Sequence, residues 1–190
     1  MRIAIFGGTF DPIHAAHIAI AIEARRHFSL DEVWFVPAAQ PPHKAGVTRA
    51  PYQDRFRMVE LACAGHEGLH ASRLEEGSER SYSIDTITRV KAARPGDEIF
   101  FLIGSDAFAE ITTWRRWTEV IQMVEFLVVV RPGHEYTVPE GARVRRLESL
   151  ALPVSSSEIR RNLSTGGSSG DLPVAVLEHI RAQHLYQPAP

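Results

Sequence analysis

Short runs of β-branched and aromatic residues alternate along this chain with longer segments that have helical spacing. This alternation is typical of a parallel β-sheet, because parallel strands need long crossover connections and these are usually helices. The first run, Arg2–Phe6, is almost continuously apolar, as expected of a central strand that is buried on both faces. The sequence therefore predicts an α/β fold with one parallel sheet and helices on both of its faces.

The spacing of apolar residues places the individual elements. On the predicted first helix, Ile18, Ala21 and Ile22 form the apolar side. The proline-rich segment Ala38–Pro51 has no periodic pattern, and a loop of that length in a compact domain is often functional. The predicted strands are Arg2–Phe6, Val33–Val36, Leu69–Arg73, Ile99–Ile103, Phe126–Val130 and an exposed last strand, Arg143–Leu147. The predicted helices are Ala15–His27, Tyr52–Ala64, Ser83–Ala93, Thr118–Met123, Ser155–Leu163 and one that starts at Pro173, with Val174, Val176, Leu177 and Ile180 as its apolar face.

Length and composition narrow the class of protein. The 190 residues favour a single domain, 1–190, and the formal net charge of −2 excludes a strongly basic nucleic-acid binder. The lone Cys63 can form neither an internal disulfide nor a site of several thiolates, and its helical context predicts buried packing. No apolar run approaches the ~20 residues of a membrane helix, and no export signal is visible. We expect a cytoplasmic protein without membrane or nucleic-acid partners, and leave a homo-oligomer open.

The segment that follows the first strand, residues 7–17, reads Gly-Gly-Thr-Phe-Asp-Pro-Ile-His-Ala-Ala-His. Its two glycines allow a tight turn and a close approach of the backbone to a ligand. The helix behind it directs free N–H groups and its positive dipole end toward the turn, which favours an anion. The alternative is an ordinary turn, and the glycines and lysine of the common phosphate-binding and dinucleotide-binding motifs are absent.

His14 and His17 are three residues apart, so both lie on one face of the first helical turn, beside that anion site. Their imidazoles could donate to phosphate oxygens, cap or pack against the helix, or ligate zinc. A zinc site needs a third ligand at suitable spacing, and the sequence offers none. Phosphate contact is the favoured interpretation.

A second anion site is predicted near residue 155. Ser155 and Glu158 have the spacing of a capping box, so a helix should begin there, and Arg160 follows one turn later. The segment could be a phosphate cradle or only a well-capped surface helix. Two anion sites in one small α/β domain fit a polyphosphate ligand.

These two segments resemble the signatures of the nucleotidyltransferase superfamily of adenylyl and cytidylyl transferases. Within it, the chain is most similar to the bacterial nicotinate-nucleotide adenylyltransferases. The family has glycine where this chain has Ala16, and the added methyl group could crowd the nucleotide. The likeness continues, in order, through Pro41–Lys44, Ser81–Thr86, Gly104–Asp106, Trp114–Trp117, Arg131–Gly133, Leu172–Pro173 and Leu185–Tyr186.

The resemblance implies a Rossmann-like fold and a defined reaction. The 5′-phosphate of nicotinate mononucleotide would attack the α-phosphorus of ATP, giving deamido-NAD and pyrophosphate. Because that phosphate is already ionised at neutral pH, catalysis would consist of alignment and charge stabilisation, without a general base. Mg²⁺ would accompany ATP, held by phosphate oxygens and water rather than by a protein metal site.

The resemblance also assigns roles to residues. His17 would contact the α-phosphate, His14 and Thr9 the neighbouring phosphates, and Arg160 with Ser156 the β and γ phosphates. The implied catalytic set is His14, His17, Lys44 and Arg160. The implied ATP site is Gly7, Gly8, Thr9, Phe10, His14, His17, Gly104, Asp106, Ser155, Ser156 and Arg160, and the implied acceptor site is Lys44, Thr86, Trp117 and Thr118.

Some of these assignments have plainer alternatives. Lys44 could be a solvated lysine, Asp106 a helix cap, and the spacing of Trp114 and Trp117 that of core aromatics, which is the favoured interpretation of Trp114. At the level of function, the rivals are the same chemistry on nicotinamide mononucleotide or phosphopantetheine, and a non-catalytic nucleotide-binding module. Thr86 and Trp117 disfavour phosphopantetheine, and only Ala16 favours the non-catalytic module.

Overall fold

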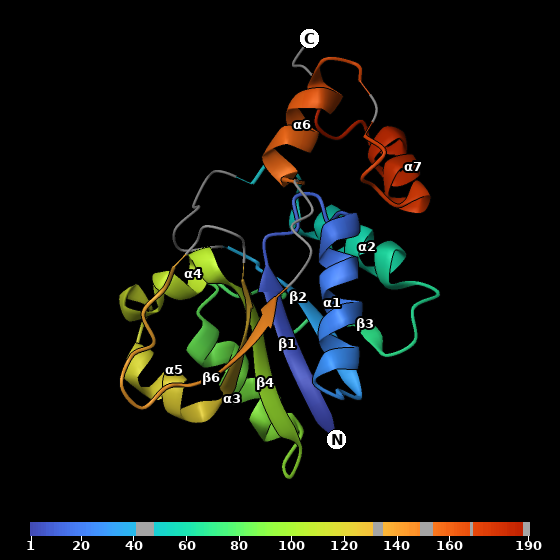
Figure 1. The fold of residues 1–190 in the computed structure, drawn as a ribbon. Helices are drawn as coiled ribbons and strands as arrows, with labels where there is room; N and C mark the ends of the chain where they lie inside the picture. Colours follow the sequence, from blue (N-terminus) through green and yellow to red (C-terminus); the bar gives the residue numbers. More distant parts are fainter. Residues whose placement is uncertain (41–47, 131–134, 149–153, 168, 188–190) are drawn as a thin grey trace.

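A six-stranded parallel sheet forms the centre of the computed structural model, which describes residues 1–40, 48–130, 135–148, 154–167 and 169–187 (Figure 1). The strand order is β3-β2-β1-β4-β5-β6, which is the Rossmann arrangement and confirms the predicted fold class. β6 lies at an edge, as expected of the arginine-rich last strand. The strands are β1 (Arg2–Gly8), β2 (Glu32–Pro37), β3 (Leu69–Ala71), β4 (Glu98–Gly104), β5 (Glu125–Val130) and β6 (Arg143–Glu148).

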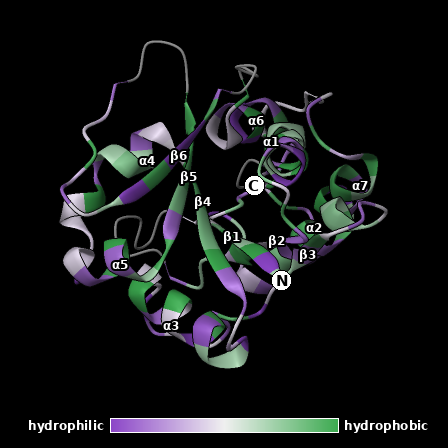
Figure 2. Cartoon of the chain, turned by 60° about the horizontal axis from the view of Figure 1, so that its bottom comes forward, coloured by the Kyte–Doolittle hydropathy of each residue, from purple (hydrophilic) through white to green (hydrophobic). Residues whose placement is uncertain are grey.

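Helices cover both faces of the sheet (Figure 2). On one side lie α1 (Ala15–His27), α2 (Tyr52–Cys63) and α7 (Val174–Ala182). On the other lie α3 (Ser83–Ala93), α4 (Ser105–Ala109), a 3₁₀ turn (Ile111–Thr113) and α5 (Trp117–Met123). α6 (Ser156–Ser164) lies beyond the carboxyl ends of the strands (Figure 1).

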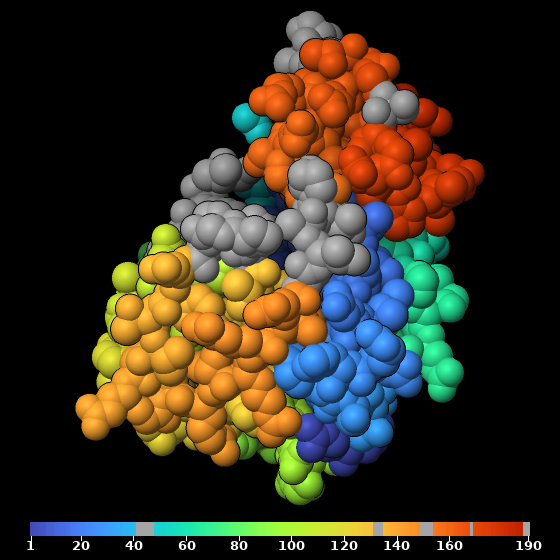
Figure 3. Space-filling model, in the orientation of Figure 1, coloured from blue at the N-terminus to red at the C-terminus, as the bar shows by residue number. Residues whose placement is uncertain are grey.

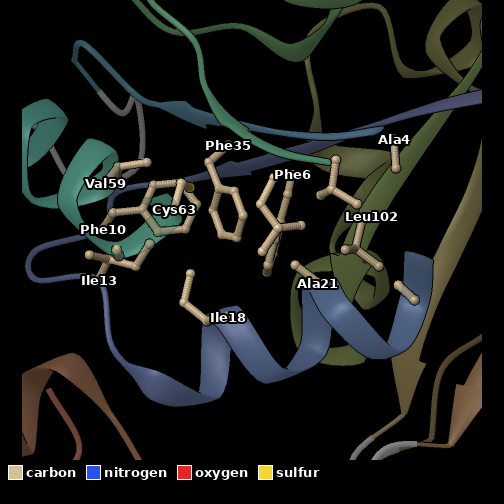
Figure 4. Close-up of a cluster of buried hydrophobic side chains, with 14 of the residues drawn as sticks. Ala4, Phe6, Phe10, Ile13, Ile18, Ala21, Phe35, Val59, Cys63 and Leu102 are labelled. Atoms are coloured by element: carbon tan, nitrogen blue, oxygen red, sulfur yellow. The ribbon is translucent and has the colours of Figure 1, made fainter. Parts of the chain in front are cut away.

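The apolar character of β1 follows from its burial on both faces. Ala4 and Phe6 point into the core beneath α1 and α2, whereas Ile3 and Ile5 point into the opposite core. Figure 4 shows Phe6 between Phe35 and the α1 side chains. Cys63 packs in the same core at 6% exposure, as predicted, and burial raises the pKa of its thiol to about 12.

Two predicted apolar faces need correction. Ile22 is 44% exposed, because the buried stripe of α1 runs through Ile18, Ala21 and Ala24 and turns away from it. Val174 is 74% exposed, because two residues of helix rotate it by about 200° from Val176. The third strand also ends earlier than predicted, and α4 and the 3₁₀ turn were not predicted, since segments this short show no periodicity.

A polar network fixes the loop that joins β1 to α1. The carboxylate of Asp11 is 4% exposed and accepts three hydrogen bonds. They come from the backbone N–H of Arg49 at 2.8 Å, the backbone N–H of Ala50 at 3.1 Å and the hydroxyl of Tyr186 at 2.7 Å. A buried carboxylate is tolerated only when it is supplied with donors in this way.

Arg55 reinforces the same loop from α2. Its guanidinium is 1% exposed and donates to the carbonyls of Thr9 at 2.7 Å, Ala39 at 3.3 Å and Ala50 at 3.2 Å. Burial lowers the pKa of Arg55, and the negative charge of Asp11 opposes that shift. A guanidinium stays ionised in proteins, so this is a buried cation shared by three backbone segments.

The helices α6 and α7 lie at the top of Figure 3, at the end of the molecule where Figure 1 shows the carboxyl ends of the strands. The backbone N–H of Ala15, the first residue of α1, donates to the carbonyl of Asp171 at 2.8 Å. His179 of α7 lies 3.1 Å from a carboxylate oxygen of Asp54 on α2. Among the described residues, no helix is long and apolar enough to cross a membrane.

We predict that Tyr186→Phe, which removes only the hydroxyl bound to Asp11, lowers the free energy of unfolding by about 1–2 kcal/mol. Urea unfolding at pH 7 measures this, and Tyr136→Phe, whose hydroxyl meets the exposed Arg146, is the matched control with a smaller effect. Burial, followed by the charge of Asp11, raises the pKa of Tyr186 above its usual 10.0. The contribution of Tyr186 is therefore present below pH 10 and lost above it, so the wild type should weaken more steeply than the variant. Equal stability at pH 7 would contradict this role.

Candidate active site

A pocket opens at the carboxyl ends of β1, β2 and β4. The strand order reverses between β1 and β4, and open α/β sheets bind ligands at such a crevice. Its volume is about 160 Å³, close to the roughly 150 Å³ of a cavity that accepts benzene, so one aromatic ring fits. The lining residues are Ile5, Gly7, Gly8, Val36, Ala38, Glu75, Ser81, Ser83, Thr86, Phe101, Ile103, Ala107 and Trp114.

Both glycines border this pocket, but only at Gly8 would a side chain not fit. A Cβ on Gly8 would lie 2.8 Å from the Phe10 ring, whereas one on Gly7 would make an ordinary contact with Phe101 at 3.5 Å. Phe10 itself has a φ of 49° and is 3% exposed, with its ring 5.8 Å from that of Phe6 and 5.5 Å from that of Phe35. Its side chain is therefore part of the core, so the predicted contact of Phe10 with ATP would have to come from its backbone.

His14 and His17 meet at the start of α1. Their ring centroids are 3.8 Å apart in a stacked arrangement, and the backbone N–H of His14 donates to Nδ1 of His17 at 3.3 Å. Because Nδ1 accepts, the neutral His17 ring carries its proton on Nε2, which makes that nitrogen a donor. Phe6 and Phe10 meet the His17 ring edge-on and restrict its orientation.

One backbone donor of this turn is already in use. Ala15 gives its N–H to Asp171, so the helix offers one donor fewer to an anion than the sequence suggests. Ala16 is 5% exposed. Within the described ranges, no group of three histidine, cysteine or acidic side chains could hold a metal ion.

The predicted second anion site lies against the first. Ser155 caps α6, with its hydroxyl oxygen accepting the N–H of Glu158 at 3.2 Å, which confirms the predicted helix start. Ser156 donates to the carbonyl of Pro12 at 3.0 Å, and Arg160 donates to the carbonyl of Asp11 at 2.7 Å. The segment is thus a capped helix and is also joined to the β1–α1 loop.

Of the predicted acceptor residues, Thr86 lines the pocket. It is 3% exposed, and its hydroxyl donates to Oε1 of Glu75 at 2.5 Å. Trp117 is half-buried as the first residue of α5 and Thr118 is exposed; neither is among the pocket-lining residues. Trp114 lines the pocket instead, because Arg116 has a φ of 53° and breaks the helical spacing between the two tryptophans.

Gly104, Asp106 and Lys44 are the other residues predicted to belong to the site. Gly104 ends β4 and is the N-cap of α4, and Asp106 lies exposed in the first turn of that helix rather than at its cap. Both are therefore at the carboxyl end of β4, on the edge where the pocket opens. Lys44 lies outside the described residues.

Sequence reasoning missed Arg55, Glu75 and the pocket position of Trp114. A signal for Arg55 was present, because it shares an i, i+3, i+4 face with the buried Met58 and Val59, and a charge on an apolar face needs partners. Glu75 gave no signal, since it lies in a turn between β3 and α3 without periodicity.

Comparison with known proteins agrees with this geometry. The profile of the cytidylyltransferase-like family matches residues 5–162. A Solibacter usitatus protein named "Probable nicotinate-nucleotide adenylyltransferase" is 62% identical over 187 residues, which cover 98% of this chain and all of that protein. A protein of the same name from Exiguobacterium sibiricum is 39% identical over 188 residues, which cover 98% of this chain and 99% of that protein.

Solved structures share the fold. The nicotinic acid mononucleotide adenylyltransferase of Plasmodium falciparum, complexed with NaAD, aligns with a TM-score of 0.80 over 97% of each chain at 21% identity. A Vibrio parahaemolyticus structure described as a "Putative Nicotinate-nucleotide Adenylyltransferase" aligns with a TM-score of 0.71 over 100% of this chain and 98% of that chain, at 19% identity. With the family profile and the full-length relatives, the chain belongs to the nicotinate-nucleotide adenylyltransferases of the cytidylyltransferase-like family.

Proposed function

We propose that this chain transfers the adenylyl group of Mg-ATP to nicotinate mononucleotide, giving deamido-NAD and pyrophosphate. The observation that carries this proposal is the pair of hydrogen bonds, Ser156 to Pro12 and Arg160 to Asp11, that joins the two phosphate-type segments. They lie at the end of the sheet where a ring-sized pocket opens. The relatives are named for this reaction, and the Plasmodium structures are complexed with NaAD and with APC.

The chemistry needs alignment more than proton transfer. An oxygen of the acceptor 5′-phosphate forms a bond to the α-phosphorus of ATP, and the bond from that phosphorus to the β-phosphate oxygen breaks. The electron pair leaves with pyrophosphate. The nucleophile is already anionic, so what limits the rate is the approach of two polyanions and the charge on the transferring group.

His17 has the geometry for charge stabilisation. Its Nδ1 is held by the N–H of His14, and its ring is held between aromatic edges, so Nε2–H is a preorganised donor. Such a donor contributes most when its target gains charge in the transition state. We assign Nε2 of His17 to the α-phosphate, with His14 and Thr9 at the neighbouring phosphates.

The triphosphate tail would lie at the N-terminus of α6. Arg160 uses one nitrogen on Asp11 and another on the Ser157 hydroxyl at 3.2 Å, which sets the plane of the guanidinium. Its other N–H groups would meet the β and γ phosphates together with Ser155 and Ser156. Lys44 stays a proposed phosphate contact on the segment between β2 and α2.

Mg²⁺ is proposed as part of the substrate. The described residues place no three metal-ligating side chains together, and Mg²⁺ binds readily through phosphate oxygens and water with few protein ligands. Its contribution would be to neutralise the triphosphate. Asp106, exposed at the carboxyl end of β4 with Gly104, is proposed to contact the nucleotide there.

The acceptor ring would enter the pocket between the glycines and Trp114. The indole and the apolar walls suit a flat aromatic ring, and Thr86 lies at the polar side of the pocket. Trp117 and Thr118 stay proposals for the outer part of the acceptor site, since they lie outside the lining.

Pyrophosphate release by the purified protein tests the function directly. The assay supplies Mg-ATP with nicotinate mononucleotide, nicotinamide mononucleotide, phosphopantetheine or no acceptor. We expect release with nicotinate mononucleotide to exceed the others, and EDTA to abolish it. If protein shown by circular dichroism to be folded releases no pyrophosphate with any acceptor, the proposed enzymatic activity is contradicted. Ala16→Gly would then be the next variant to test.

We predict that His17→Ala lowers kcat by about 10²- to 10³-fold, as loss of a transition-state donor does, with a much smaller change in the KM for ATP. The matched control is His27→Ala, which removes an exposed imidazole from the other end of α1 and should leave kcat near the wild-type value. Thermal melting of both variants separates lost chemistry from lost structure. An unchanged kcat in folded His17→Ala would remove this role from His17.

A further inference from the structure

Glu75 is a buried carboxylate inside the pocket to which neither the sequence nor the proposed mechanism gives a task. It is 8% exposed and belongs to the pocket lining. Its Oε1 accepts a hydrogen bond from the hydroxyl of Thr86 at 2.5 Å. Its Oε2 is buried and, within the described part of the chain, has no hydrogen-bond partner.

This arrangement carries a free-energy cost. A buried carboxylate oxygen without a donor carries a desolvation penalty, and each such group in a native structure needs an explanation. Among the described residues, no lysine, arginine or histidine forms an ion pair with Glu75. Arg55 attracts it only across the interior.

The other residues that line the pocket indicate which kind of ligand would compensate the negative charge of Glu75. Ile5, Val36 and Phe101 make the pocket apolar, and Trp114 adds the face or edge of an indole. An apolar, ring-sized space with one aromatic wall and one carboxylate is complementary to a flat organic cation. It is a poor environment for an anion.

Thr86 supports the same conclusion. Its single hydroxyl proton is committed to Glu75, with the carbonyl of Tyr82 more distant at 3.4 Å, so it presents lone pairs to a ligand. A carboxylate on the ligand gains nothing from an acceptor. The Thr86 and Glu75 pair therefore does not bind the acid group of nicotinate, which must take its donors elsewhere.

We propose that Glu75 is the charge partner of the pyridinium ring of the acceptor and makes the pocket specific for the oxidised, cationic ring. This inference rests on the proposed function. A pyridine nitrogen bonded to ribose carries a positive charge but no N–H, so attraction to Oε2 is electrostatic, aided by the polarised C–H groups beside the nitrogen. A dihydropyridine ring, which is neutral, gains nothing from Glu75.

The test is Glu75→Gln, which keeps the shape and an oxygen for Thr86 but removes the charge. With saturating Mg-ATP, we expect the KM for nicotinate mononucleotide to rise about tenfold while kcat changes less than about twofold. The inhibition constants of two probes should stay unchanged: dihydronicotinate mononucleotide, which has a neutral ring, and ribose 5-phosphate, which has no ring. Glu79→Gln, an exposed change of the same charge, is the matched control.

Two results would overturn the proposal. One is a KM for nicotinate mononucleotide in Glu75→Gln within twofold of the wild type. The other is a rise in the inhibition constant of ribose 5-phosphate or dihydronicotinate mononucleotide that equals the rise in the KM for nicotinate mononucleotide. Such a result would mean that Oε2 binds a ribose hydroxyl or that Glu75 has only a structural role. If the wild type releases no pyrophosphate, the proposed function fails instead, and calorimetric titration of the three compounds into wild type and Glu75→Gln still decides whether Glu75 recognises ring charge.

Discussion

The carboxylate of Asp11 is the constraint on which the site depends. Its donors come from Arg49 and Ala50, just before α2, and from Tyr186, while its own backbone carbonyl accepts a hydrogen bond from Arg160 of α6. Because a buried carboxylate needs all of its donors, the segments that supply them cannot drift apart without a large free-energy cost. The loop after β1 is therefore held from several sides before any nucleotide arrives.

The organisation of the sheet could be predicted because its physical cause is local. A strand covered on both faces must be continuously apolar, and Arg2–Phe6 shows this directly in the sequence. The faces of single residues were harder to predict. Ile22 and Val174 are apolar residues on helices, but each points away from the buried stripe of its own helix, and the direction of that stripe is set by the elements that pack against the helix after folding.

The site likewise contains contacts that local spacing predicts and contacts that depend on the folded chain. His14 with His17, and Ser155 with Glu158, are pairs within one helical turn, so spacing alone brings them together. Glu75 meets Thr86 across a turn and the start of α3, a contact that exists only after the chain has folded. Trp114 packs against the core, as predicted, but it also lines the pocket, and its spacing from Trp117 did not reveal that second position because the left-handed Arg116 interrupts the helix between them.

The pairing of residue 11 with residue 186 also orders events in time. A chain that emerges from the ribosome amino-end first exposes Asp11 early, and β1 can join β2 long before α6 exists. The hydroxyl that completes the shell of Asp11 is supplied only after residue 186 has left the ribosome exit tunnel. The nascent protein thus gathers the donors of this loop in stages, first Arg49 and Ala50 and last Tyr186, so a chain that has not yet been made as far as residue 186 lacks the fully braced loop between β1 and α1.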